Sequence, residues 1–301
     1  MTDATVPTTP ARPSIFATIV KAMRTFVVQQ PLGTLGALLV LIIGFAGIFA
    51  EWVAPYDPLA IDYAATFGAP SWQHWAGTDD FGRDILSRLI YGARTAMVIS
   101  LASSLIGVTI GALLGVASAY FGGKIDFIIQ RIMDIMLSFP IIVLALVVVA
   151  VLGKWPVLGI DLNLVLAIAL PMVPKVARVI RSAALQVAVM PYVDAARALG
   201  FSHTRIVLRH MVPNLVAPFL ILFTAYIAQA ILLEAGLSFL GLGVTEPTPS
   251  WGLMLSGNAS QFFLTAPWVV IFPGVAISLS VLGFNMYGDA LRDWLDPKFK
   301  Y

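Results

Sequence analysis

The sequence predicts an all-α membrane protein with six transmembrane helices, and its composition and its apolar stretches support that prediction. The chain has 301 residues, of which 59% are hydrophobic and 11% are charged, and its mean hydropathy is +0.91. Such a chain is too apolar for a soluble protein of this length. About 20 apolar residues cross the hydrocarbon core as a helix. Six stretches meet that length, at 32–53, 95–119, 127–152, 162–181, 215–233 and 266–287.

Basic residues are distributed unequally between the segments that connect these stretches. If the N-terminus is inside, only four of the 18 Lys and Arg residues fall outside, namely Arg83, Arg88, Arg94 and Lys154. Short cytoplasmic loops of membrane proteins carry the excess of Lys and Arg. Both termini are therefore expected in the cytoplasm. The net charge of +2 follows from this topology and does not indicate binding to nucleic acid.

This topology divides the chain into four parts. Residues 1–30 form a cytoplasmic tail, of which 1–14 are expected to be disordered, and 289–301 form a second tail. Residues 31–94 hold the first span and an external loop, in which the amphipathic stretch 83–91 is expected to lie along the membrane surface. Residues 95–288 form a five-helix core that includes the cytoplasmic loop 185–213. The first span is longer than the apolar part of a signal peptide, which favours a retained helix.

The loop between the fourth and fifth spans contains a short pattern of helix, glycine turn and helix. A first helix is expected from Tyr192 to Leu199, ended by Gly200 in a left-handed conformation. A second helix is expected over 204–211, opened by Ser202 and ended before Pro213. Taken alone, the segment also fits an ordinary amphipathic surface helix.

This loop resembles the cytoplasmic "EAA" loop of permease subunits in ABC importers, whose pattern is Glu-Ala-Ala, three residues, Gly, nine residues and Ile-x-Leu-Pro. The corresponding residues here are Asp194, Ala195, Ala196, Gly200, His210, Val212 and Pro213. Asp194 replaces the Glu, and His210 and Val212 replace the Ile and Leu. Residues 209–214 are similar to the version of this loop in the dipeptide, oligopeptide and nickel branch of these permeases. Residues 77–94 and 236–252 are similar to its C-type permease, so the resemblance covers about 30–301.

The resemblance implies a subunit that forms half of a translocation pathway for peptides or similar small solutes, in a bacterial or archaeal inner membrane. Nickel chelates, opines or oligosaccharides are alternative substrates within the same family. The implied partners are a second homologous permease, two ABC ATPase subunits, an external solute-binding protein and membrane lipid. The loop 194–213 would couple to the ATPases. Four outer residues are candidate contacts with an external partner or interface: Asp79, Arg83, Asp84 and Trp251.

The chemistry that the sequence lacks narrows the function further. No phosphate-binding loop of the type Gly-x-x-x-x-Gly-Lys-Ser/Thr is present, so ATP and Mg²⁺ are expected on partner subunits, with no cofactor in this chain. No metal-ligand spacing occurs, and the three histidines lie outside the expected spans. A membrane enzyme therefore has little support. A secondary transporter would need buried ion-coupling residues, and the spans contain few polar groups: Arg131, Asp134, Gln229, Glu234 and Asn285.

Three local features of the spans carry further expectations. Pro171 and Pro174 are expected to kink or interrupt the fourth span and are a candidate hinge. Arg131 and Asp134, three residues apart, are placed to pair with each other. Small residues at every fourth position from 103 to 119 line one helix face, and packing within the subunit is favoured over a subunit interface.

Overall fold

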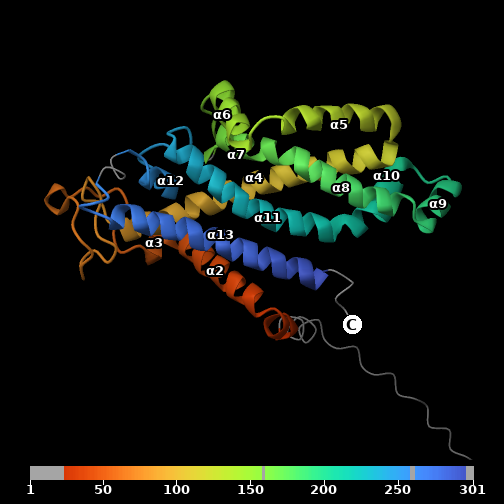
Figure 1. Cartoon of the computed structure of the whole chain (residues 1–301). Helices are drawn as coiled ribbons and strands as arrows, with labels where there is room; N and C mark the ends of the chain where they lie inside the picture. The colour runs from red at the N-terminus through yellow and green to blue at the C-terminus, as the bar shows by residue number, and fades with distance from the viewer. Residues whose placement is uncertain (1–23, 158–159, 258–261, 296–301) are drawn as a thin grey trace, which may run out of the picture.

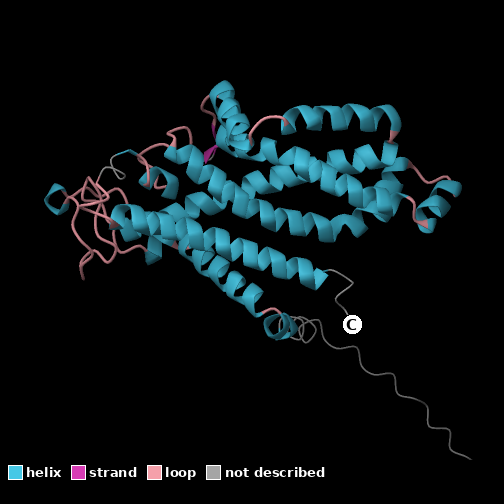
Figure 2. Ribbon diagram, in the orientation of Figure 1, coloured by secondary structure: helices cyan, strands magenta, loops and turns pink. Residues whose placement is uncertain are grey.

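The computed structural model describes residues 24–157, 160–257 and 262–295, so the disorder expected over 1–14 lies outside the described residues. The described chain is a bundle of long helices with loops at both ends (Figure 1, Figure 2). Five helical segments are long and apolar enough to cross a membrane, and a sixth candidate span consists of two helices bent by 96°. The prediction of an all-α membrane protein is confirmed, and the described helices give the predicted six spans when the bent pair counts as one span.

The helices follow one another as α2 (Pro31–Ile48), α3 (Ala50–Val53), α4 (Ile85–Phe121), α5 (Gly123–Leu137), α6 (Ile141–Leu152), α7 (Leu162–Ala169), α8 (Val173–Ala188), α9 (Pro191–Ala198), α10 (His203–Ile206), α11 (Val212–Phe239), α12 (Trp251–Met254) and α13 (Trp268–Leu295). Short 3-10 turns cover Tyr63–Ala65 and Leu170–Met172, and a π-helical turn covers Val207–Met211. Among the described residues, the only strands are β1 (Pro156–Val157) and β2 (Ile160–Asp161), which pair in antiparallel orientation.

Helix α4 begins earlier than expected and includes the stretch predicted to lie on the membrane surface. Asp84 caps it by accepting a hydrogen bond from the Ser87 amide at 2.8 Å, and the helix then runs without interruption for 37 residues. Ile85 is fully buried in an apolar cluster with residues of α11, α12 and α13. The prediction that 83–91 lie along the membrane surface is therefore wrong, because the apolar face of 85–91 packs inside the protein.

The third span is broken between α5 and α6 at residues 138–140. Pro140 has no amide hydrogen to donate, and a proline disfavours helical conformation in the residue before it. Helix α5 lies along α8, to which two ion pairs connect it. Asp126 accepts hydrogen bonds from the Arg181 guanidinium at 2.7 and 2.6 Å, and Asp134 pairs with Arg178. The prediction that Asp134 pairs with Arg131 of its own helix is therefore wrong.

The stripe of small residues on α4 faces α7 and α8, which confirms that it packs within the subunit. A side chain on Gly111 would lie 2.7 Å from Val176 Cβ of α8, and one on Gly107 would lie 2.7 Å from the Ala169 carbonyl oxygen of α7. Glycine permits this close approach of helix backbones. The larger of the apolar clusters lies around this contact and extends to α11.

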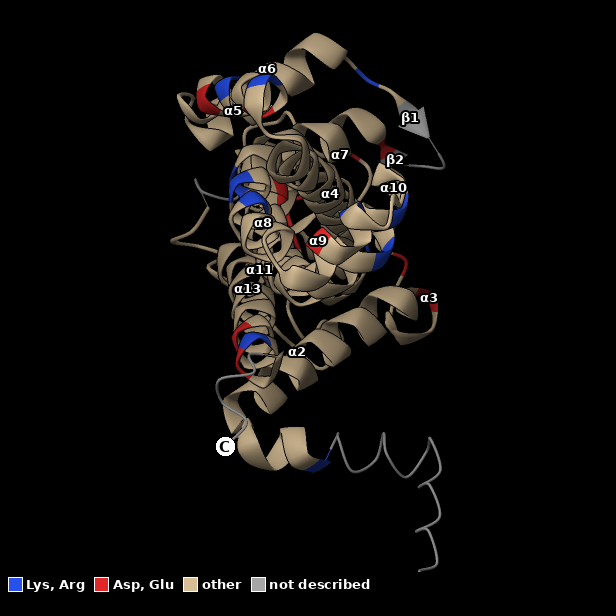
Figure 3. Ribbon diagram, turned by 90° about the vertical axis from the view of Figure 1, so that its right-hand side faces the viewer, with Lys and Arg blue, Asp and Glu red and all other residues tan. Residues whose placement is uncertain are grey.

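Pro171 and Pro174 interrupt the fourth span as expected. The chain passes from α7 through the 3-10 turn Leu170–Met172 into α8, and both prolines are buried. Motion at this position stays a prediction. Helices α9 and α10 lie at one end of the bundle, called the α9 end, and α12 lies near the other, called the α12 end (Figure 1). Viewed from the α9 end, basic residues mark α5, α8 and α10 (Figure 3).

Candidate functional site

The segment between α8 and α11 projects from the α9 end as two short helices, called the α9–α10 loop (189–211). Proline at the start of α9 and Ser202 at the start of α10 set the two helix beginnings, since the Ser202 hydroxyl accepts from the Arg205 amide. Gly200 joins them with φ of +73°, and a Cβ added at this position would meet no atom within 4 Å. The expected pattern of helix, glycine turn and helix is therefore present.

The faces of α9 separate the residues of the resembling motif into two groups. Asp194 and Ala195 are exposed, and Asp194 pairs with Arg197 at 3.1 Å. Ala196 is buried with Val193 and Ile206 in a small apolar cluster. The exposed group is available to a partner, whereas the buried group holds the two short helices together.

The second half of the loop differs from expectation because the helix does not end before Pro213. Residues 203–239 form one continuous helical segment, and Pro213 lies in the first turn of α11. A π-helical turn precedes Pro213, and the Asn214 side chain donates to the His210 carbonyl oxygen at 2.9 Å. The His210 ring stacks on Phe201, so this residue points into the loop.

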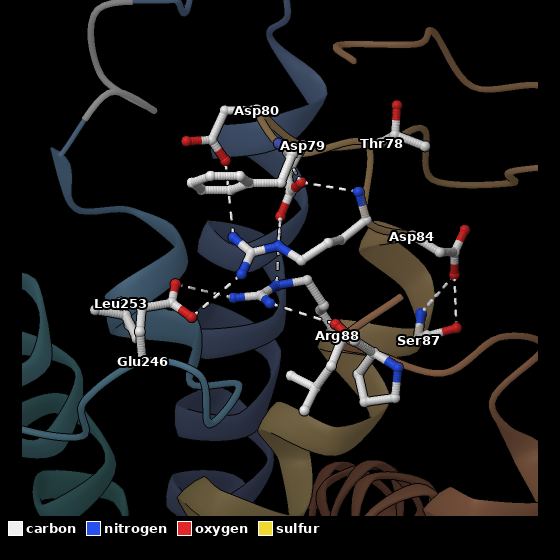
Figure 4. Close-up of polar contacts among 12 residues, drawn as sticks. Thr78, Asp79, Asp80, Asp84, Ser87, Arg88, Glu246 and Leu253 are labelled. Atoms are coloured by element: carbon white, nitrogen blue, oxygen red, sulfur yellow. Dashed lines mark hydrogen bonds and ion pairs between the residues drawn. The ribbon is translucent and has the colours of Figure 1, made fainter. Parts of the chain in front are cut away.

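At the α12 end, four charged side chains join two segments that are distant in sequence (Figure 4). The Asp79 carboxylate accepts from Arg83 Nε at 2.7 Å, and it lies 3.6 Å from Arg88 Nε. Glu246 receives Arg83 and Arg88 on its two oxygens, at 3.2 and 3.4 Å. These groups border a cavity of about 260 Å³. Burial raises the pKa of the adjacent Asp80, the Asp79 charge adds to the rise, and Arg83 opposes it.

Asp84 and Trp251, the other two candidate contact residues, also make contacts within the chain. Asp84 binds the Ser87 amide and hydroxyl and lies 2.9 Å from His74 Nδ1. Trp251 is 2% exposed, and its indole nitrogen donates to the Leu89 carbonyl oxygen at 2.9 Å. Asp79, Arg83, Asp84 and Trp251 are all buried. They hold the segment before α4 and helix α12 onto α4, and their contact with an external partner stays a prediction.

Glu234 of α11 closes the base of the segment 240–249, which we call the strap. One carboxylate oxygen accepts hydrogen bonds from Ser238 before the strap and from Ser250 after it, both at 2.8 Å. The Ser238 hydroxyl also accepts from the Val244 amide at 3.1 Å. The strap is thus fixed at its base by Glu234 and near its middle by Glu246.

Sequence reasoning did not single out Glu246, nor the pairing of Arg88 with it. One signal was present, because Arg83 and Arg88 lie on the side with few basic residues and need buried counter-charges. The described residues contain no group of three or more His, Asp or Glu side chains arranged to hold a metal ion. The site therefore consists of a projecting loop at one end and charged interlocks at the other.

Comparison with known proteins identifies the architecture. Residues 107–301 match the family model described as binding-protein-dependent transport system inner membrane component. The chain belongs to this family of inner-membrane transport permeases. The prediction of a multi-pass permease of a binding-protein-dependent ABC importer is thereby confirmed. Hydrolysis of ATP belongs to the ATPase of such a system, and the permease itself is not an enzyme. An ATPase and a binding protein are therefore its partners.

Curated relatives cover nearly the whole chain. A dipeptide transport system permease of Alkalihalophilus pseudofirmus is 42% identical over 90% of this chain and 88% of its own length. A glutathione transport system permease of Escherichia coli is also 42% identical over 90% and 88%. A putative peptide transport permease of Brucella suis is 37% identical over 100% and 99%.

A solved structure shares the fold. An inward-facing form of the MetNI methionine ABC transporter matches with a TM-score of 0.55 and 18% identity, over 70% of this chain and 98% of that one. The family assignment removes the two other classes weighed from the sequence, a secondary transporter and a membrane enzyme.

Proposed function

We propose that this permease carries peptides, including short or modified ones, and that it couples transport to ATP hydrolysis through the α9–α10 loop. The geometry of the loop is the observation that supports the coupling role. Two short helices project beyond the bundle, and Asp194, Arg197 and Leu199 on them are exposed. Exposed charged and apolar groups on a projecting loop suit contact with another protein. The curated relatives, which are named for peptides, dipeptides and glutathione, support the substrate class.

In this arrangement, the α9 end and both termini lie in the cytoplasm, and the α12 end lies outside. A second, homologous permease completes the pathway, and two ATPase subunits bind at the α9 end, with ATP and Mg²⁺. The binding protein delivers substrate to the α12 end. ATP binding favours one arrangement of the helices over another, which is the thermodynamic content of coupling.

The topology is tested with single cysteines, because the natural chain has none. Ser202 and Ser71, both exposed, are replaced individually by cysteine, and intact cells are treated with a membrane-impermeant thiol reagent. Labelling of Ser71→Cys alone is expected. Labelling of Ser202→Cys alone would reverse the orientation and remove the loop from the ATPases.

Substrate and coupling are tested with the complete complex in proteoliposomes. Radiolabelled alanyl-alanine and glutathione serve as probes, and uptake is measured with ATP, without ATP and without the binding protein. Uptake of either probe that requires both is expected. If neither probe is taken up while a nickel chelate, an opine or an oligosaccharide is, the peptide assignment is wrong and the coupling assignment stands.

A further inference from the structure

The α9–α10 loop contacts the end of α4 through Tyr120 and Phe121, and its last part contacts the main apolar cluster through Val207 and Met211. Tyr120 packs against the main apolar cluster of the bundle and also against the small cluster of the loop, and it is the residue of the described chain that belongs to both. Helix α4 ends at Phe121 and has no covalent link to the loop. Tyr120 therefore connects α4 to a loop that the backbone joins only to α8 and α11.

Tyr120 contacts both short helices of the loop. Its hydroxyl oxygen lies 2.8 Å from His203 Nδ1 of α10, and the two rings meet edge to face at 5.6 Å. The Arg197 guanidinium of α9 lies 5.5 Å from the centre of the Tyr120 ring, within the range of a cation–π contact. Movement of either short helix relative to the bundle must disturb one of these contacts.

The helix that carries Tyr120 is held firmly at the same end. Two residues earlier, Ser118 hydrogen-bonds Asp126 of α5 and accepts from the Gln130 side chain at 2.9 Å. Asp126 in turn binds Arg181 of α8. The backbone joins the loop to α8 through a turn at 189–190 and to α11 through the π-helical turn 207–211. Because the turn at 189–190 is not helical, displacement of α9 reaches the bundle through side-chain contacts such as those of Tyr120.

We propose that Tyr120 is a positioning residue that braces the α9–α10 loop against α4, so that displacement of the loop moves the bundle. This inference rests on the proposed coupling role of the loop. Through the brace, a push on α9 or α10 reaches a helix about 55 Å long at 1.5 Å per residue. Near its other end, α4 contacts Trp251 and Glu246, so the brace links the loop to both ends of the protein.

The test uses the complete complex with its ATPases and binding protein, and it measures uptake per ATP hydrolysed with alanyl-alanine and glutathione as probes. Tyr120→Leu removes the hydroxyl and the ring, while Tyr120→Phe removes only the hydroxyl. Tyr91→Leu is the matched control, because Tyr91 is also a partly buried tyrosine of α4 with an arginine, Arg94, 5.4 Å from its ring centre. It lies at the opposite end of the helix.

Tyr120→Leu is expected to keep its ATPases and hydrolyse ATP, but to lower uptake per ATP by about five-fold or more, the scale of typical coupling free energies. Tyr120→Phe should fall between it and the wild type, and Tyr91→Leu should match the wild type. If Tyr120→Leu transports within about two-fold of the wild type per ATP, which is below that scale, the brace is wrong. If uptake falls only in proportion to lost protein or lost ATPase, the role is structural and the proposal is also overturned.

A double-mutant cycle guards against a variant that fails to fold. If Tyr120 acts through His203, the pair Tyr120→Phe with His203→Leu should lower uptake per ATP no more than the larger single effect. Independent, multiplying effects would contradict the contact. The Gly200→Val variant separates this inference from the proposed function. Normal ATPase binding and transport in that variant would overturn the coupling role itself, whatever the result at Tyr120.

Discussion

Replacing Glu234 by alanine is expected to release the strap from α11. The change removes the oxygen that accepts both the Ser238 and the Ser250 hydroxyl, and all three residues are at most 1% exposed, so water does not replace it in the closed state. A buried hydrogen bond contributes about 1 to 1.5 kcal/mol net. Two such bonds give about 2 to 3 kcal/mol, which corresponds to about a 30- to 150-fold rise in the opening equilibrium.

Amide hydrogen exchange followed by mass spectrometry measures this opening in the intact complex. Peptides covering residues 240–255 should exchange about 30- to 150-fold faster in Glu234→Ala, while peptides from α4 and α8 should not change. Glu234→Gln should show a smaller effect, because its amide oxygen still accepts both hydroxyls. Gln229→Ala, earlier on α11, is the control. Unchanged exchange over 240–255 in Glu234→Ala would show that the carboxylate does not close the strap.

Three further perturbations test packing, loop geometry and the charged interlock. Gly111→Leu should destabilise the protein by about 1 to 3 kcal/mol in thermal unfolding in detergent, since the new side chain meets a valine of α8. Gly44→Ala should be neutral, because the nearest atom to its added Cβ is 3.7 Å away. Equal effects of the two variants would contradict the close packing at Gly111. Gly200→Val should cost about 1 to 2 kcal/mol locally from its left-handed backbone and lower ATPase co-purification and uptake at normal expression. Glu246→Ala should cost about 1 to 3 kcal/mol, because it removes the carboxylate that binds both Arg83 and Arg88 and leaves them only the acids of their own segment. Exposed Glu51→Ala should cost less than about 1 kcal/mol. Hydrogen exchange over 54–84 measures both, and equal values would refute the role of Glu246.

Much of the candidate loop could be predicted from local sequence. Gly200 between two short helices and Ser202 as a cap both follow from propensities that act within a few residues. The continuation of the second helix through Pro213 could not, because it depends on the π-helical turn and on the Asn214 side chain bonding the His210 carbonyl. A proline ends or continues a helix according to which groups replace its missing donor.

The break in the third span shows the limit of hydropathy. Residues 127–152 read as one apolar stretch, and composition alone gives no angle between its halves. Pro140 marks a weak point in the helix, but the 96° bend depends on α5 being held along α8 by Asp126 and Arg181. The sequence likewise placed Asp134 near Arg131, whereas the neighbouring helix supplied a better-positioned arginine.

By itself, the sequence determined the approximate positions of the spans, because a helix in lipid satisfies its own backbone and needs only length and hydrophobicity. It also determined the motif of the α9–α10 loop, through a resemblance that the family match supports. Only the tertiary structure decided which residues meet across the bundle. Tyr120 with His203, Glu246 with Arg88 and Glu234 with Ser250 are pairings between separate segments, and their contacts depend on helix packing that no local pattern records.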